Sequence, residues 1–172
     1  HMVQNVGDGS YYHASHQNIR YAVATDQTMT FRILYNGVIA NTGGQEYSAD
    51  NSIQNMCRKL EVDGVRKIVL ATKTPRAYRG TGLPGIVSLT GPDEIPAQLL
   101  ELEKTKGVTV LIYDGECANE RRRRQKRGKL AQPKTFTIVN EDVCENCGDC
   151  GQKANCMSLQ KVETPFGRKT QI

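Results

Sequence analysis

Four cysteines within thirteen residues constrain the carboxyl-terminal end of this 172-residue chain more than any other feature. Their order is Cys144-x2-Cys147-x2-Cys150-x5-Cys156. Three thiolates separated by two-residue gaps can surround one face of a cubane cluster, as at the start of a bacterial ferredoxin run. A structural zinc site usually takes two separated cysteine pairs instead. The spacing therefore predicts a [4Fe–4S] site in a ferredoxin-like module over 136–172, with zinc or plain structural cysteines as the alternatives.

The last gap of this cysteine run leaves one assignment open. A bacterial ferredoxin run usually ends in x3-Cys-Pro, and its fourth cysteine ligates the other cluster of a two-cluster protein. The gap before Cys156 is five residues, and no proline follows it. Cys156 therefore either completes the cluster of Cys144, Cys147 and Cys150 or serves a second cluster.

The first 115 residues alternate strand and helix signals, which is typical of an α/β layer with a parallel sheet. Apolar and β-branched runs predict strands over 28–35, 67–71 and 108–113. Helices are expected over 14–25, 52–62 and 95–104, and the second is expected to be capped by Asp50 or Ser52. The Gly- and Pro-rich stretch 74–92 is expected to be irregular.

Basic side chains crowd into the next segment and supply the formal net charge of +5. Seven of the nine positions from Arg121 to Lys129 are arginine or lysine. Neither an aromatic platform nor a base-reading module accompanies them, so nucleic-acid binding is disfavoured. We predict a solvated basic linker over 119–135, or a contact for an acidic partner, between a domain at 3–118 and the cysteine module. No apolar stretch approaches the roughly 20 residues that a membrane helix needs.

Gly7-Asp8-Gly9 is by itself a common turn sequence, but its distance from Asn36 gives it another meaning. Asn36 follows Gly9 after twenty-six residues and stands at the end of a predicted strand. Because the carboxyl ends of adjacent parallel strands meet at one edge of a sheet, we expect Asp8 and Asn36 to lie side by side. Carboxylate and other oxygen ligands suit Mg²⁺, which often bridges them to phosphate. A helix start near 12–15 would favour the same anion.

These residues resemble the thiamine-diphosphate signature, in which Gly-Asp-Gly is followed at this interval by Asn. The sequences GDGSYYHASHQNIR at 7–20 and NTGGQ at 41–45 are similar to those of the pyruvate and indolepyruvate ferredoxin oxidoreductases. The carboxyl-terminal VETPFGRK at 162–169 also resembles the bacterial indolepyruvate enzymes. The resemblance covers nearly the whole chain after His1-Met2, which is typical of a cloning remnant. It departs at Ala14-Ser15, where the family usually has Ser-Gly.

The resemblance implies an enzyme that oxidatively decarboxylates a 2-oxoacid, such as indolepyruvate or another aryl pyruvate, to acyl-CoA. Electrons would pass through iron–sulfur clusters to ferredoxin, which is the implied partner together with the remaining domains or subunits of a cytoplasmic parent enzyme. The implied Mg²⁺ ligands are Asp8, Asn36 and the Val38 carbonyl, and His13 would face the substrate. The implied contacts with thiamine diphosphate are Gly7, Asp8, Gly9, Asn36, Val38, Asn41, Thr42 and Gly43.

The implied fold is α/β, with the carboxyl-terminal part of a thiamine-diphosphate-binding domain over 3–118. The strands that precede Gly-Asp-Gly in a complete domain of this kind are absent, so the chain alone is expected to be inactive. Two other functions remain open. One is a stand-alone electron-transfer module, and the other is a zinc-stabilised nucleic-acid-binding or regulatory domain.

Overall fold

The computed structural model describes residues 1–40, 44–45, 52–132, 134–154 and 156–172. The chain divides into two compact units, His1–Leu130 and Ala131–Ile172, and each is described by itself. The three-part division with a separate linker over 119–135 stays a prediction. Among the helices of the described residues, none is both long enough and apolar enough to span a bilayer.

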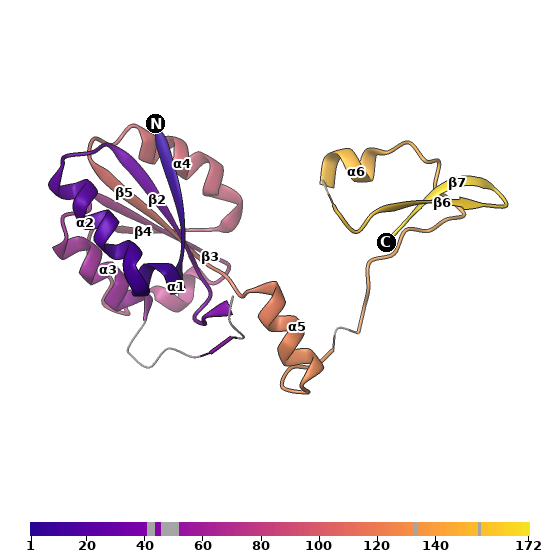
Figure 1. Ribbon diagram of the computed structural model, residues 1–172, viewed down its shortest axis with the longest axis horizontal. Coiled ribbons are helices and arrows are strands. Elements are labelled where there is room, and N and C mark those ends of the chain that lie inside the picture. Colours follow the sequence, from indigo (N-terminus) through magenta and orange to yellow (C-terminus); the bar gives the residue numbers. More distant parts are fainter. Residues whose placement is uncertain (41–43, 46–51, 133, 155) are drawn as a thin grey trace. The chain divides into compact units, whose positions relative to one another are not determined.

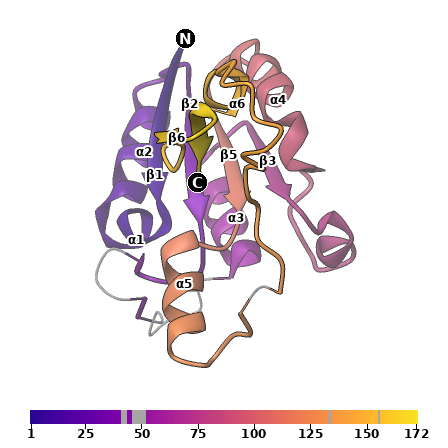
Figure 2. The same ribbon diagram turned by 90° about the vertical axis from the view of Figure 1, so that its right-hand side faces the viewer.

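A five-stranded parallel sheet forms the centre of the first unit (Figure 1). Its strands are β1 (Met2–Gly7), β2 (Met29–Tyr35), β3 (Lys67–Thr72), β4 (Val87–Thr90) and β5 (Val108–Asp114). The spatial order is β1-β2-β5-β3-β4, and the arrows of β2, β5 and β3 point the same way in Figure 2. The predicted α/β layer with a parallel sheet is therefore confirmed.

Helices lie on both faces of this sheet and beyond the carboxyl ends of its strands (Figure 2). They are α1 (Asp8–Ser10), a π-helical turn η1 (Tyr11–Ser15), α2 (His16–Ala24), α3 (Ile53–Val62), α4 (Ile95–Glu103) and α5 (Ala118–Lys126). Helices α2 and α3 share one core cluster with Val110 and Ile112 of β5, whereas α4 packs with Leu111. Because neighbouring strand residues point to opposite faces, α4 lies on the face opposite α2 and α3.

Helix α3 shows why the apolar spacing predicted its position. Its buried residues are Ile53, Met56, Cys57 and Leu60, which recur at helical intervals. The Ser52 hydroxyl accepts a hydrogen bond from the Asn55 N–H at 3.3 Å, so Ser52 is the N-cap that the sequence predicted.

Two expectations for the first unit are wrong. The stretch 74–92 is not irregular throughout, because it contains β4, whose backbone pairs with β3 at the sheet edge. Four residues between Gly and Pro signals are too few to show a strand period. The helical segment after β1 also begins earlier than 12–15, because its first turn starts at Asp8 itself.

The basic segment is helical rather than an extended linker over its first part. Ala, Glu, Arg, Gln and Lys are all strong helix formers, which accounts for α5. Gly128, with φ of +68°, ends the helix in a Schellman motif. The Gly128 N–H donates to the Gln125 carbonyl at 3.1 Å, and the Lys129 N–H donates to the Arg124 carbonyl at 2.8 Å.

The second unit contains one short helix, α6 (Asp149–Ala154), and an antiparallel hairpin of β6 (Gln160–Thr164) and β7 (Gly167–Gln171). Among its described residues, Thr170 alone is buried. Large apolar side chains such as Phe136, Ile138 and Met157 are exposed. The described part of this unit therefore has no hydrophobic core of its own.

Candidate functional site

The Asp8 carboxylate joins the end of β1 to the loop that follows β2. Its Oδ2 accepts hydrogen bonds from the N–H groups of Asn36 and Gly37, both at 2.9 Å. Its Oδ1 accepts from the Gly9 N–H at 2.8 Å, and the residue is only 2% exposed. Gly37 has φ of +74°, a conformation that side-chain-bearing residues rarely adopt. The structure thus brings Asp8 and Asn36 together at one edge of the sheet, although their role as Mg²⁺ ligands stays a prediction.

The oxygen atoms at this point fit a hard cation. Each carboxylate oxygen offers about two lone pairs, so Asp8 Oδ1 keeps one acceptor position beyond the bond from Gly9. Asn36 Oδ1 accepts from the Val38 N–H at 3.1 Å and likewise keeps one position. A carboxylate, an amide oxygen and a backbone carbonyl are a donor set that Mg²⁺ accepts. We therefore expect Asp8, Asn36 and Val38 to be able to share one ion.

A crevice opens beside this loop, where the strand order reverses. The chain proceeds from β2 through α3 to β3 and β4, then returns through α4 to place β5 beside β2. Ligands of open α/β sheets bind at such switch points, outside the carboxyl ends of the strands. The crevice has a volume of about 380 Å³. Its walls are Asn36, Val38, Gly44, Glu116, Cys117, Glu120, Arg124, Arg127 and Lys129.

Helix α5 and the residues that flank it give the crevice its charge, and α5 lies beyond the arrowheads of β2 and β5 (Figure 2). The Arg123 guanidinium donates to the Ala40 carbonyl at 2.9 Å and to Glu120 at 2.8 Å, which ties α5 to the loop after β2. Arg124 pairs with Glu116 at 3.6 Å. The lining holds three cations and two carboxylates, a net charge of 3 − 2 = +1.

The sequence did not predict that the basic run lines this crevice. Charge alone gave a solvated linker, and only the strong helix propensity of its residues could have signalled an ordered segment. Gly44 shows how closely α5 approaches, because a Cβ added there would collide with the Glu120 carboxylate. Gly44 also has φ of +78°, so a larger residue would be strained as well as blocked.

Not all of the residues that were predicted to contact the cofactor or the substrate line this crevice. His13 is exposed on η1 and does not line the crevice. Gly7 lines a separate groove beside α2. Asn41, Thr42 and Gly43 lie outside the described residues. Of the predicted cofactor contacts that the structure describes, Asn36 and Val38 line the crevice, and Asp8 with Gly9 lies directly behind them.

The role of the four cysteines of the second unit as cluster ligands stays a prediction. Within the described part of the chain, no group of three or more His, Cys, Asp or Glu side chains is placed to hold a metal ion. Cys150 and Cys156 nevertheless line one pocket of about 140 Å³, and Thr170 lines it with them. The Thr170 N–H donates to Cys144 Sγ at 3.4 Å. Cys144 therefore contacts Thr170, and Cys150 and Cys156 share a pocket with it, whereas Cys147 does not line this pocket.

The surroundings of Cys144 favour its thiolate. Hydrogen bonds from the backbone N–H groups of Asn146 and Thr170, with the nearby Lys169 ammonium, lower the pKa of the Cys144 thiol below its ordinary value. The Lys169 ammonium itself donates to the Cys144 carbonyl at 2.7 Å. Since the thiolate is the metal-binding form of cysteine, this environment suits a metal ligand.

No protein-family profile matches the chain, and no curated protein is significantly similar to it. Two solved structures resemble it. One is a Mycobacterium smegmatis protein described as a thiamin diphosphate-dependent enzyme, with 23% identity over 67% of this chain and a TM-score of 0.44. The other is 2-oxoglutarate:ferredoxin oxidoreductase from Magnetococcus marinus, with 13% identity over 78% of this chain and a TM-score of 0.47. The chain spans 18% and 47% of their respective lengths.

Proposed function

We propose that this chain is part of a thiamine-diphosphate-dependent oxidoreductase that oxidatively decarboxylates 2-oxoacids. The observation that carries the proposal is the buried Asp8 carboxylate, which holds the Asn36 loop at the edge of a crevice at the switch point. A turn-forming Gly-Asp-Gly would not need a buried, triply hydrogen-bonded carboxylate. A metal-binding loop would, because its ligand oxygens must be fixed before the ion arrives.

Different residues at the crevice would bind the magnesium ion and the diphosphate. Asp8, Asn36 and the Val38 carbonyl hold the ion, and the cations Arg124, Arg127 and Lys129 balance the charge of the phosphates. Thiamine diphosphate, when bound, supplies the nucleophilic carbon that makes decarboxylation feasible. The protein supplies placement, and in the complete enzyme further domains would close the site.

The second unit carries the iron–sulfur cluster of the proposal. It has 42 residues, from Ala131 to Ile172, and Thr170 is the only described residue that is buried. A domain near 40 residues rarely folds without disulfides, a metal or oligomerisation. Its cysteines are free thiols, and Cys144 favours the thiolate. A [4Fe–4S] cluster held by Cys144, Cys147, Cys150 and Cys156 would supply the missing core and a path for electrons to ferredoxin.

The finer assignments are part of the same proposal and rest on the sequence resemblance. They are indolepyruvate or another aryl pyruvate as the substrate, coenzyme A as the acyl acceptor, and His13 as a substrate contact. The exposed position of His13 allows it to meet a substrate held by a further domain.

Metal analysis of anaerobically purified protein tests the second unit. We expect about four irons and as much sulfide per chain, with an absorption band near about 400 nm that dithionite bleaches. Stoichiometric zinc without colour would replace this proposal by a zinc-stabilised binding or regulatory domain.

Calorimetry with magnesium pyrophosphate, the anionic part of the cofactor, tests the first unit. Arg127→Ala and Asn36→Ala should each weaken the binding of magnesium pyrophosphate. Lys153→Ala in α6 is the matched control, because Lys153 pairs with Asp149 in the second unit. Equal binding by all three variants would remove the crevice from the proposal. A cluster without pyrophosphate binding would instead favour a stand-alone electron-transfer module.

A further inference from the structure

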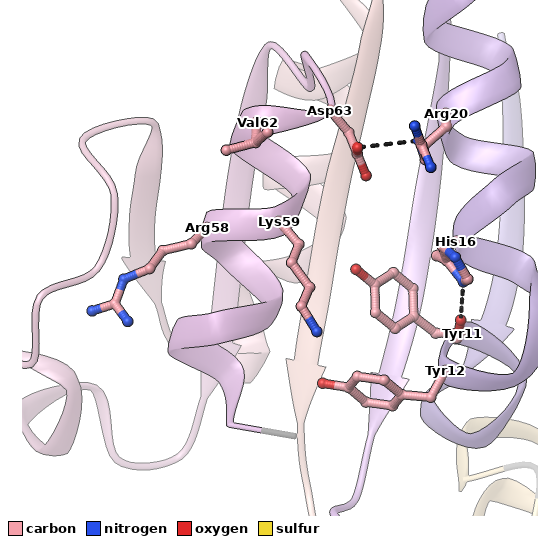
Figure 3. Close-up of a pocket in the computed structure, with 8 residues that line it drawn as sticks. All are labelled: Tyr11, Tyr12, His16, Arg20, Arg58, Lys59, Val62 and Asp63. Carbon is pink, nitrogen blue, oxygen red and sulfur yellow. Dashed lines mark hydrogen bonds and ion pairs between the residues drawn. The ribbon is translucent and has the colours of Figure 1, made fainter. Parts of the chain in front are cut away.

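A second hollow lies between the helical segment that follows β1 and helix α3 (Figure 3). Its volume is about 460 Å³, which falls within the range of small-molecule sites. It shares no lining residue with the crevice of the proposed cofactor site. Nothing in the proposed function uses it.

One wall of the hollow consists of three rings. Tyr11 and Tyr12 meet edge to face at 5.0 Å and 86°, and the His16 ring lies 6.1 Å from Tyr11. His16 Nδ1 lies 3.2 Å from the Tyr11 carbonyl oxygen. A carbonyl can only accept, so Nδ1 carries the proton and the ring orientation is fixed. Tyr11 is 2% exposed, which anchors this wall in the core.

Tyr11 and Tyr12 stand on the π-helical turn η1, and His16 is the first residue of α2. Tyr12 and His16 are four residues apart and would share one face of an ordinary α-helix. A turn of this kind re-aims the side chains around it and occurs frequently at functional sites. Its five residues, Tyr11–Ser15, directly precede α2.

The charged residues that line the hollow leave cations in excess. Arg20 Nε pairs with Asp63 Oδ1 at 3.3 Å and closes one end. Lys59 Nζ lies 5.9 Å from the centre of the Tyr12 ring, and none of the ion pairs among the described residues involves it. In Figure 3, Lys59 extends toward the tyrosines, whereas Arg58 and Val62 point away from them. The lining holds Arg20, Arg58, Lys59 and Asp63, a net charge of 3 − 1 = +2. The Arg58 guanidinium donates to Asn55 Oδ1 and to the Gly82 carbonyl, both at 3.1 Å. With Arg20 paired to Asp63, Lys59 is the lining cation that extends toward the rings.

We propose that this hollow binds a small aromatic monocarboxylate. The flat ring of the ligand packs against Tyr12 and His16, where aromatic pairs gain stabilisation beyond their buried area. The carboxylate lies at Lys59, beside the Tyr12 ring, and balances the charge of that ammonium. A protein segment fits less well, because lysine and aspartate are depleted at the centres of protein interfaces and this space holds Lys59 and Asp63.

Saturation-transfer NMR with 2-naphthoate tests the proposal on the whole chain. The binding free energy per non-hydrogen atom that is usual for small ligands gives 2-naphthoate an expected Kd on the order of 1 mM. Saturation-transfer NMR can measure a Kd in this range. Lys59→Met should raise Kd about fivefold, the effect of one partly solvated ion pair. Tyr12→Leu should raise it by a similar factor through the lost ring contact. The neutral analogue 2-naphthalenemethanol should bind wild type and Lys59→Met equally.

Lys104→Met is the matched control, because Lys104 is an exposed lysine at the C-cap of α4 that pairs with Glu101 at 2.6 Å. It should leave the Kd unchanged. Lys59 is exposed, so its replacement leaves the fold intact, and circular dichroism verifies this for Tyr12→Leu. Failure of wild type to saturate below about 10 mM would overturn the proposal, as would an unchanged Kd in Lys59→Met.

Discussion

Replacing Asp8 by alanine should destabilise the first unit by more than any exposed substitution. The carboxylate accepts three backbone N–H groups, those of Gly9, Asn36 and Gly37, at 2.8 to 2.9 Å. Alanine removes all three acceptors at once. The two loop N–H groups then have no partner on the β1 side, so the loop after β2 loses its attachment to the neighbouring strand.

The expected loss of stability follows from the number of hydrogen bonds that are removed and from their exposure to water. A hydrogen bond to a charged group contributes about 1.5–3 kcal/mol net, so three give at least about 4.5 kcal/mol. Asn36 and Gly37 are half-buried, and water can therefore replace part of the loss. We expect a net cost of about 3 kcal/mol, which corresponds to a Tm lower by roughly 10 °C for a unit of this size. Asp8→Asn keeps one acceptor oxygen and should cost about half as much.

Urea unfolding followed by far-ultraviolet circular dichroism measures this cost. Glu61→Ala is the control, because Glu61 is exposed on α3 and its replacement should change the free energy of unfolding by no more than about 0.5 kcal/mol. A cost below about 1 kcal/mol for Asp8→Ala would refute the reasoning, since the carboxylate would then not hold the loop. The argument for a pre-fixed ion site would fail with it.

Three further predictions concern the cysteines and the glycine that faces α5. Burial raises the pKa of the Cys57 thiol to about 12, so its stabilisation is complete below its ordinary pKa of 9.0 and is lost as the pH rises toward 12. The urea midpoint should therefore fall between about pH 9 and 12, and less steeply in Cys57→Val. In metal-free protein at neutral pH, mass spectrometry should find iodoacetamide on Cys144 before the other thiols, because its thiolate is favoured; equal rates would contradict this. Gly44→Ala should lower the free energy of unfolding in urea by about 1–2 kcal/mol, because the alanine would take a positive φ and its Cβ would collide with Glu120. A cost near zero would show that α5 packs elsewhere.

The sequence predicted the elements that carry a clear apolar pattern. Strand β5 and helix α3 are of this kind, since each carries an uninterrupted apolar pattern at its own period. Strand β4 carries only four residues at the sheet edge, and its pairing with β3 is a tertiary event that no local pattern contains. Helix α5 was missed for another reason, because its charges outweighed the helix propensity of the same residues.

The candidate site shows the same division. Asp8 and Asn36 were predictable as neighbours, because parallel pairing places the ends of β1 and β2 together. The crevice walls from α5 were not, since they join residues far apart in the sequence, such as Arg123 and Ala40, which are 83 positions apart. The second hollow likewise depends on Lys59 meeting Tyr12, a contact set by how α3 packs beside α2. Sequence patterns predict which groups carry chemistry, but the packing of helices decides which of them meet.

The two units differ in what their sites require before a ligand arrives. In the first unit the Asp8 loop is held by backbone hydrogen bonds that persist without any ion, so cofactor binding and folding are separate events. In the second unit Thr170 is the one described residue that is buried, and the thiols around it do not yet converge. Metal affinity there includes the free energy of ordering the chain. Loss of the proposed cluster should therefore unfold the second unit cooperatively while leaving the sheet of the first unit intact, since the described core clusters lie wholly within the first unit.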